Sequence, residues 1–272
     1  GYSRESAYSG NQVQLHDIER DGALVSVLPL YSDLAGLPKM DEGTWGAPDA
    51  GMPDVSVVPL STRQRSMLLS RMHFGGKPLI HNNQLYLLAS VTQSSSTEIH
   101  AVCFDLVDTV MPGRVKWIQK ISSHDNSGQG FGRYDQNSEV IEAATLIASG
   151  NRVFALTNCG AAACLDARDG FPYWVTSYRR SPSRSRGYYS AGREILISPP
   201  SLCGMTLVCA PLSAQYGIAL NAQSGTPVRP LLANERDYAA ARFFIGTMDG
   251  YAYFQTSNGV VAEPRSEERR VG

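Results

Sequence analysis

The chain has 272 residues, with 24 lysines and arginines against 25 aspartates and glutamates and a formal net charge of -1. This balance gives no overall positive field that would gather nucleic acid, and we predict no nucleic-acid partner. No run of about 18 apolar residues occurs, so we also predict no membrane span. The low charged fraction of 18%, with 25 glycines, 15 prolines and 13 tyrosines, is typical of strands joined by turns.

Residues 1–77 are expected to form an irregular lead-in, with at most one degenerate sheet. Strand-like runs occur at residues 23–30 (ALVSVLPL) and 55–60 (VSVVPL), and a loop-like stretch rich in Gly, Pro and Asp separates them. The opening residues, GYSRESAYSGNQ, lack an initiator Met and the apolar stretch of a signal peptide. A signal peptide therefore either lies outside this sequence or never existed.

Three copies of one pattern follow, at residues 83–117, 151–174 and 204–229. Each copy reads as strand, turn, strand, an Asp or Asn, a glycine turn and a further strand. The Asp or Asn positions are Asp105, Asp166 and Asn221; the glycines are Gly113, Gly170 and Gly225; and four residues after each glycine stand Trp117, Trp174 and Arg229. The glycines are 57 and 55 residues apart, so the features keep one period.

A fourth copy begins near the C-terminus, in the stretch DGYAYFQTSNGVVA. Gly259 corresponds to Gly160 and Tyr253 to Phe154, and the copy breaks off where the Leu-Asp step is expected. A fixed period in this range is typical of repeat proteins, and two-residue alternation within a copy predicts a small antiparallel sheet. Such sheets bury both faces when they stack radially. We therefore predict an all-β fold, a partial β-propeller of four-stranded antiparallel blades that is incomplete in this chain.

These positions predict structural roles. The glycine permits a tight turn between the third and fourth strands of a blade, and the Asp or Asn before it caps that turn. The tryptophan is suited to filling the seam between neighbouring blades, where its indole N–H needs one partner. We predict no catalytic, cofactor-binding or metal-binding residue.

The stretch CLDARDGFPYW, residues 164–174, resembles the tryptophan-docking repeat of the PQQ-like, or quinoprotein-like, β-propeller family. The family pattern is Ala-x-Asp-x-x-x-Gly-x-x-x-Trp, and here Cys164 takes the alanine place. The copy ALNAQSGTPVR keeps the alanine and glycine but has Asn221 and Arg229, and CFDLVDTVMPGRVKW keeps the Asp, Gly and Trp with extra turn residues. The resemblance covers roughly residues 78–262.

The resemblance implies a bacterial, extracytoplasmic protein of the periplasm or cell envelope. Quinoprotein dehydrogenases of this family hold PQQ and calcium with a vicinal Cys-Cys disulfide, a tryptophan platform and a Glu/Asn/Asp set. This chain has no Cys-Cys dipeptide and no acidic cluster of the kind that binds calcium. We therefore expect a non-catalytic binding or scaffolding module with a protein partner and no cofactor. The alternative is a fragment of a PQQ- and calcium-dependent dehydrogenase whose site residues lie elsewhere.

The cysteines and histidines show no metal-ligand spacing. The five cysteines (Cys103, Cys159, Cys164, Cys203 and Cys209) form no CxxC pair, and we expect most of them to be buried. A disulfide between residues 159 and 164 or between 203 and 209 stays open. The four histidines considered (His73, His81, His100 and His124) are interpreted as satisfied or surface side chains.

Three segments are interpreted as solvated or foreign. The arginine-rich residues 178–193 are interpreted as an exposed insertion rather than an RNA-binding loop, and the glycine-rich residues 127–135 as a flexible loop. We expect partner contacts from loops at one rim, including residues 93–97 and 178–193. Residues 263–272 contain RSEERRVG, which resembles an adapter-derived translation, and we predict a non-native tail.

Overall fold

The computed structural model describes twelve parts of the chain: residues 13–17, 23–28, 62–92, 96–107, 113–125, 144–157, 159–179, 199–211, 214, 216–231, 241–256 and 259–264. Several sequence predictions fall outside these residues. They concern the strand-like run at 55–60, the glycine-rich segment 127–135, most of the loops at 93–97 and 178–193, and residues 265–272.

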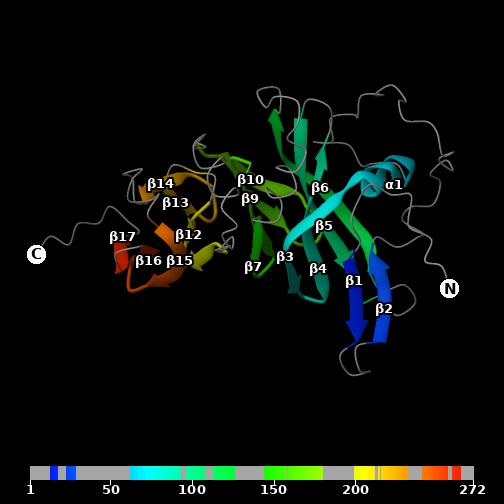
Figure 1. Cartoon of the computed structure of the whole chain (residues 1–272), viewed down its shortest axis with the longest axis horizontal. Coiled ribbons are helices and arrows are strands. Elements are labelled where there is room, and N and C mark those ends of the chain that lie inside the picture. Colours follow the sequence, from blue (N-terminus) through cyan, green and yellow to red (C-terminus); the bar gives the residue numbers. More distant parts are fainter. Residues whose placement is uncertain are drawn as a thin grey trace, which may run out of the picture.

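The described residues form four successive antiparallel sheets, each built from consecutive strands (Figure 1). The first contains β3 (His73–His81), β4 (Gln84–Thr92), β5 (Ser96–Asp105) and β6 (Arg114–Asp125). The second contains β7 (Thr145–Ser149), β8 (Arg152–Leu156), β9 (Ala161–Asp166) and β10 (Pro172–Ser177). The third contains β11 (Ser201–Cys203), β12 (Thr206–Cys209), β13 (Gly217–Asn221) and β14 (Pro227–Leu231). The fourth contains β15 (Ala241–Met248), β16 (Tyr251–Thr256) and β17 (Gly259–Pro264).

This arrangement confirms the predicted all-β class and the arc of propeller blades. The first strands of neighbouring sheets are in contact, β3 with β7 and β11 with β15, so the sheets converge along their first strands. The first sheet starts at His73, within the segment predicted as the lead-in, and β17 runs to Pro264, two residues past the predicted end of the repeats.

The strand register repeats from sheet to sheet. Third-strand residues with small side chains pair with the residue four positions after the turn glycine; the pairs are Cys103 with Trp117, Cys164 with Trp174, and Ala219 with Arg229. The second strand places an aromatic or apolar side chain beside each pair; these are Tyr86, Phe154 and Val208. The small side chain leaves room for its two larger neighbours on the same face of the sheet.

The hydrophobic core lies between the sheets. All six residues of β9 are buried, because both faces of the second sheet are covered. Its Ala163 and Leu165 pack toward the first sheet, whereas Ala162 and Cys164 pack toward the third. Sheets covered on both faces show continuous apolar runs instead of polar alternation, which the sequence AAACLD illustrates.

The outer face of the first sheet is covered by a helix, α1 (Thr62–Arg71), which the sequence analysis did not predict. Leu68 and Leu69 of the helix are buried against apolar residues of β3 to β6. The helix is ten residues long and has no acidic residue in its first turn, so its sequence signal is short. A separate hairpin joins β1 (Val13–Asp17) to β2 (Ala23–Leu28), and β2 matches the first predicted strand-like run. No described helix is long and apolar enough to cross a membrane.

Candidate functional site

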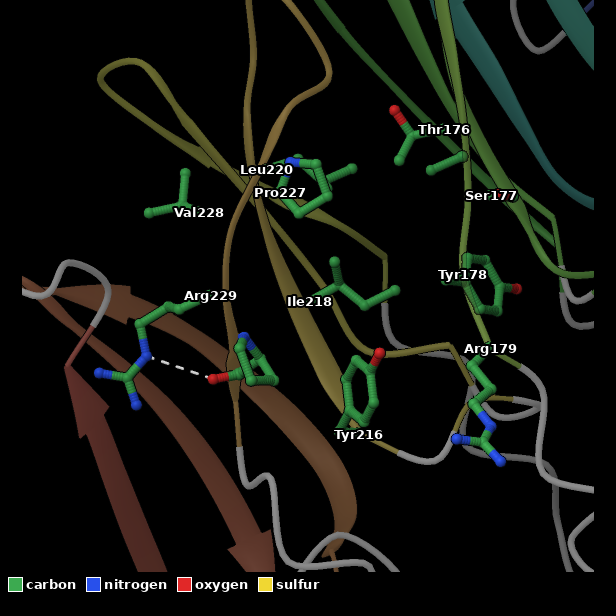
Figure 2. A pocket seen from close by; sticks show the side chains of 12 residues that line it. Thr176, Ser177, Tyr178, Arg179, Tyr216, Ile218, Leu220, Pro227, Val228 and Arg229 are labelled. Carbon is green, nitrogen blue, oxygen red and sulfur yellow. Dashed lines mark hydrogen bonds between the residues drawn. The ribbon is translucent and has the colours of Figure 1, made fainter.

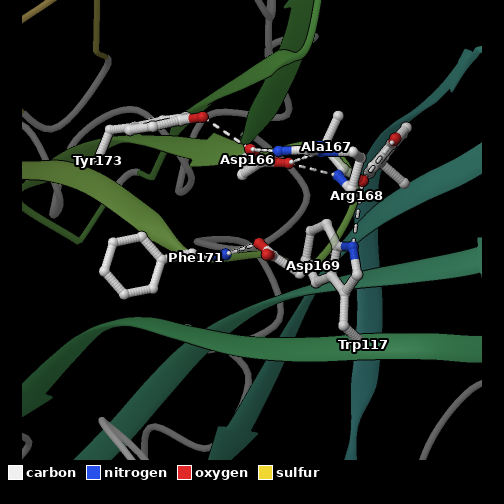
Figure 3. Close-up of polar contacts among 8 residues, drawn as sticks. Trp117, Asp166, Ala167, Arg168, Asp169, Phe171 and Tyr173 are labelled. Carbon is white, nitrogen blue, oxygen red and sulfur yellow. Dashed lines mark hydrogen bonds and ion pairs between the residues drawn. The ribbon is translucent and has the colours of Figure 1, made fainter.

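The turn between β9 and β10 is organised by the buried carboxylate of Asp166. Its Oδ1 accepts a hydrogen bond of 2.8 Å from the backbone N–H of Arg168. Its Oδ2 accepts hydrogen bonds from the Arg168 guanidinium at 3.2 Å and from the Tyr173 hydroxyl at 2.7 Å (Figure 3). The Arg168 side chain, with help from Tyr173, lowers the pKa of the Asp166 carboxyl well below its usual value, and burial opposes this shift only in part. Asp166 is therefore ionised and engaged in holding the turn.

The other repeats place a polar side chain at the same point. Asp105 Oδ1 accepts a 2.9 Å hydrogen bond from the N–H of Val107, and Asn221 Oδ1 accepts one of 2.9 Å from the N–H of Gln223. The glycine N–H then bonds the carbonyl of this residue in all three turns, at 2.6 Å for Gly113, 2.9 Å for Gly170 and 2.8 Å for Gly225. All three glycines have positive φ, which glycine adopts without strain.

The first sheet joins the second through Trp117. The indole lies against Gly170, and a Cβ atom added at that glycine would be 2.6 Å from Trp117 Cε3. The indole N–H donates a 3.2 Å hydrogen bond to the carbonyl of Ala167 (Figure 3). The same carbonyl accepts a hydrogen bond from the Tyr86 hydroxyl at 3.1 Å. The turn glycine of one blade is therefore the seat for the tryptophan of the blade before it.

The second and third sheets are joined in the same way, by a tryptophan that packs on the turn glycine of the next sheet; we call this contact a joint. A Cβ atom at Gly225 would be 2.5 Å from Trp174 Cδ2, and the Trp174 indole N–H donates a 3.1 Å hydrogen bond to the carbonyl of Ala222. Arg152 donates to the same carbonyl at 3.2 Å, taking the part that Tyr86 plays at the first joint. The tryptophans thus lie where neighbouring sheets meet, and each indole N–H has a partner.

Between the third and fourth sheets, an ion pair takes the place of the contact between tryptophan and glycine. Arg229, at the tryptophan position, places Nη2 at 3.2 Å from Glu263 Oε2 on β17. The register pairs Tyr253 with Ala262, whereas Phe154 pairs with Cys164, so the intervening turn is one residue shorter in the fourth sheet. When Tyr253 is matched to Phe154, Gly259 therefore takes the position of Ala161, and the predicted match to Gly160 is wrong by one residue.

A groove of about 230 Å³ opens between β10 of the second sheet and β13 and β14 of the third (Figure 2). Its buried part is apolar and includes Ala162, Ile218 and Leu220. The rest of the lining is formed by Thr176, Ser177, Tyr178 and Arg179 at the end of β10, by Tyr216, and by residues 227–230 of β14, which include Arg229. The sequence analysis marked Arg179 as part of a basic segment but missed the groove, because its residues come from two repeats.

A second feature that the sequence analysis missed is a buried polar group on β5 and β6. Glu98 Oε1 accepts from Lys120 Nζ at 2.8 Å, and Glu98 Oε2 is 3.7 Å from His100 Nε2. His100 is fully buried, and neither ring nitrogen has a hydrogen-bond partner within the described structure. Burial, and then Lys120, lower the pKa of His100 to about 3. The interpretation of His100 as a satisfied or surface histidine is therefore wrong.

The other histidines differ from His100. His81 Nε2 donates to the carbonyl of Gly150 at 2.7 Å, and His73 is half-buried on β3. The side chain of His124 lies outside the described residues. A signal for His100 existed in the sequence, because Glu98 and His100 occupy one face of an otherwise apolar strand.

The described cysteines and possible metal ligands can be compared with the features that PQQ-binding relatives are expected to have. All five cysteines are free thiols, so both disulfides left open by the sequence are absent. Burial raises the pKa of the Cys209 thiol to about 12, as expected for an inert core cysteine. Across the described ranges, no three His, Cys, Asp or Glu side chains gather where they could hold a metal ion.

Comparisons with known proteins give matches among solved structures. BamB from Moraxella catarrhalis is 16% identical over 70% of this chain and 49% of that protein, with a TM-score of 0.40. A europium-containing methanol dehydrogenase is 16% identical over 57% of this chain and 24% of its own, with a TM-score of 0.36. A quinohemoprotein alcohol dehydrogenase from Pseudomonas putida is 12% identical over 68% of this chain and 28% of its own, with a TM-score of 0.37. No family model matches, and no curated protein matches.

The chain spans about half the length of BamB and less of the two dehydrogenases. The first and second sheets share three features. Each has a polar residue that caps the turn, a turn glycine with positive φ, and a tryptophan that packs on the turn glycine of the next sheet.

Proposed function

We propose that this chain is a non-catalytic binding module built from PQQ-like propeller repeats, and that it holds a partner protein outside the cytoplasm. The groove between the second and third sheets supports this proposal. Its buried part is apolar, its walls carry tyrosines and arginines, and it opens at the outer strands, where a partner has access. Tyrosine and arginine are enriched in protein interfaces, and a concave apolar floor suits an anchoring side chain.

An exposed apolar side chain on the lining adds to this support. Val228 on β14 lines the groove and is 38% exposed. An apolar side chain that stays accessible beside a buried apolar floor can contact an apolar side chain of a partner.

Site-specific photo-crosslinking tests this proposal. Benzoylphenylalanine placed at Val228, on the rim of the groove, is expected to form an adduct with a discrete protein of the cell envelope. Ile80 on β3 of the first sheet is 68% exposed and serves as the matched control position. Equal labelling at both positions, or none at Val228, would contradict a binding surface at this groove.

Titration of the folded chain with PQQ, with and without calcium, tests the competing function. The proposal expects no saturable binding in either condition. Saturable, calcium-dependent binding would overturn the non-catalytic reading and favour a dehydrogenase fragment.

A further inference from the structure

The side chains that line the groove have an unbalanced charge. Twelve residues line it, and among them are two arginines, Arg179 and Arg229, and no acidic residue. Arg229 is engaged by Glu263, whereas Arg179 is exposed and forms no ion pair with another described residue. Among the charged residues of the lining, Arg179 is therefore the one whose charge is not balanced by a described carboxylate (Figure 2).

The residues that follow Arg179 in the sequence are also basic. Residues 180–193 directly follow Arg179 and contain four arginines and no acidic residue, although the whole chain has a net charge of -1. An unbalanced positive charge at a binding groove of a near-neutral protein attracts an acidic partner and selects against a basic one.

The size of the groove limits what it can hold. Pockets for small-molecule ligands are typically about 300–1,000 Å³, and this groove is smaller, at about 230 Å³. Its lining residues come from β9 and β10 of one sheet and from β13 and β14 of the next. These dimensions suit one or two side chains of an extended segment better than a cofactor.

Positive charge alone would attract any anion, so the apolar residues of the groove decide whether a peptide or a nucleic acid fits better. The floor formed by Ala162, Ile218 and Leu220 is buried, and Tyr216 faces the hollow beside Ile218 (Figure 2). Phosphate backbones are bound by charge, and single-stranded bases by stacking on exposed aromatic faces, whereas an aliphatic floor matches an apolar side chain. The observations therefore favour a peptide over RNA.

We infer that this groove binds an extended acidic segment of a partner protein, with one aromatic or aliphatic side chain over Ala162 and Ile218 and a carboxylate paired with Arg179. This inference rests on the proposed function and names the partner chemistry of the same site. Binding is expected to require both the carboxylate that pairs with Arg179 and the apolar side chain over Ala162 and Ile218.

Fluorescence polarisation with labelled peptides of about ten residues tests this inference. The panel has an acidic peptide with a central Phe, the same peptide with Ser for Phe, a version with Gln for each acidic residue, and a basic version. An oligouridylate of similar length is the nucleic-acid probe. Only the acidic peptide with Phe is expected to bind saturably, and its affinity is expected to fall with added salt.

Two variants of the chain locate the binding. Arg179→Glu reverses the charge at the mouth of the groove and is expected to raise the Kd about tenfold, since pairing with the peptide becomes repulsion. Arg114→Glu makes the same charge change at an exposed arginine on β6, away from the groove, and is expected to leave the Kd within about twofold. Tyr216→Ala is expected to weaken the acidic peptide with Phe but not alter the response to salt.

The inference is overturned if the oligouridylate or the Gln peptide binds as well as the acidic peptide, if Arg179→Glu and Arg114→Glu act alike, or if no peptide binds. Failure here differs from failure of the proposed function. A crosslinked partner at Val228 with no peptide binding would reject the acidic-segment chemistry and keep the binding module. Absence of both would reject both.

Discussion

Replacing Gly170 with alanine tests the joint between the first and second sheets. The backbone at Gly170 has φ +77, and the added Cβ would lie 2.6 Å from Trp117 Cε3 and 2.7 Å from Cδ2. The positive φ costs about 1–2 kcal/mol in a residue with a side chain, and overpacking against the ring adds about 1–3 kcal/mol. We therefore expect Gly170→Ala to lower the free energy of unfolding by about 2–5 kcal/mol.

The same sheet offers a matched control. Gly150, between β7 and β8, also has positive φ, at +57, but a Cβ there would meet nothing within 4 Å. Gly150→Ala is expected to cost only the backbone part, about 1–2 kcal/mol. Urea unfolding followed by circular dichroism measures both variants, with equal m-values required for the comparison.

A double-mutant cycle isolates the ring contact. Trp117→Ala removes the indole, while the Ala167 carbonyl keeps its hydrogen bond from Tyr86. In that background Gly170→Ala is expected to cost no more than Gly150→Ala, which corresponds to a coupling energy of about 1–3 kcal/mol. Equal costs for Gly170→Ala and Gly150→Ala in the otherwise unchanged chain would refute the idea that the glycine is a seat for the tryptophan.

Three further predictions follow from the core and the turns. The pKa of His100 is lowered from 6.5 to about 3, so the unfolded chain binds a proton more tightly than the folded chain. The free energy of unfolding is therefore highest above pH 6.5 and falls by about 2 kcal/mol on acidification to pH 5. His100→Phe is expected to remove this pH dependence, measured by urea unfolding at each pH. A thiol reagent is expected to label Cys203 first, because the other four cysteines are buried, and to count five thiols after denaturation. Asp166→Asn is expected to cost about 1–3 kcal/mol in urea unfolding because it weakens the bonds to Arg168 and Tyr173, whereas the exposed Asp169→Asn costs less than about 0.5 kcal/mol.

Each of these has a clear contrary result. An unchanged pH slope in His100→Phe would show that His100 does not bear the proton linkage. Fewer than five thiols in the denatured chain would indicate a disulfide. Similar losses for Asp166→Asn and Asp169→Asn would mean that the ion pair and the tyrosine contact contribute little.

The sequence alone determined the repeat, its phase and the chemistry of its turns. Turn chemistry is local, so an Asp or Asn followed by a glycine is enough to mark the loop between the third and fourth strands. The alternation and the fixed period then required antiparallel sheets that stack on one another. The tryptophans of the first two copies, Trp117 and Trp174, could be assigned to seams on their size and their single N–H donor.

Only the tertiary structure decided which residues meet across the seams. Trp117 lies 53 positions before Gly170 in the chain, and no local pattern links them. The groove combines Ala162 and Arg179 of one repeat with Tyr216 and Ile218 of the next. Contacts between repeats depend on the packing of side chains from distant segments. A single sequence records the segments but not their distances.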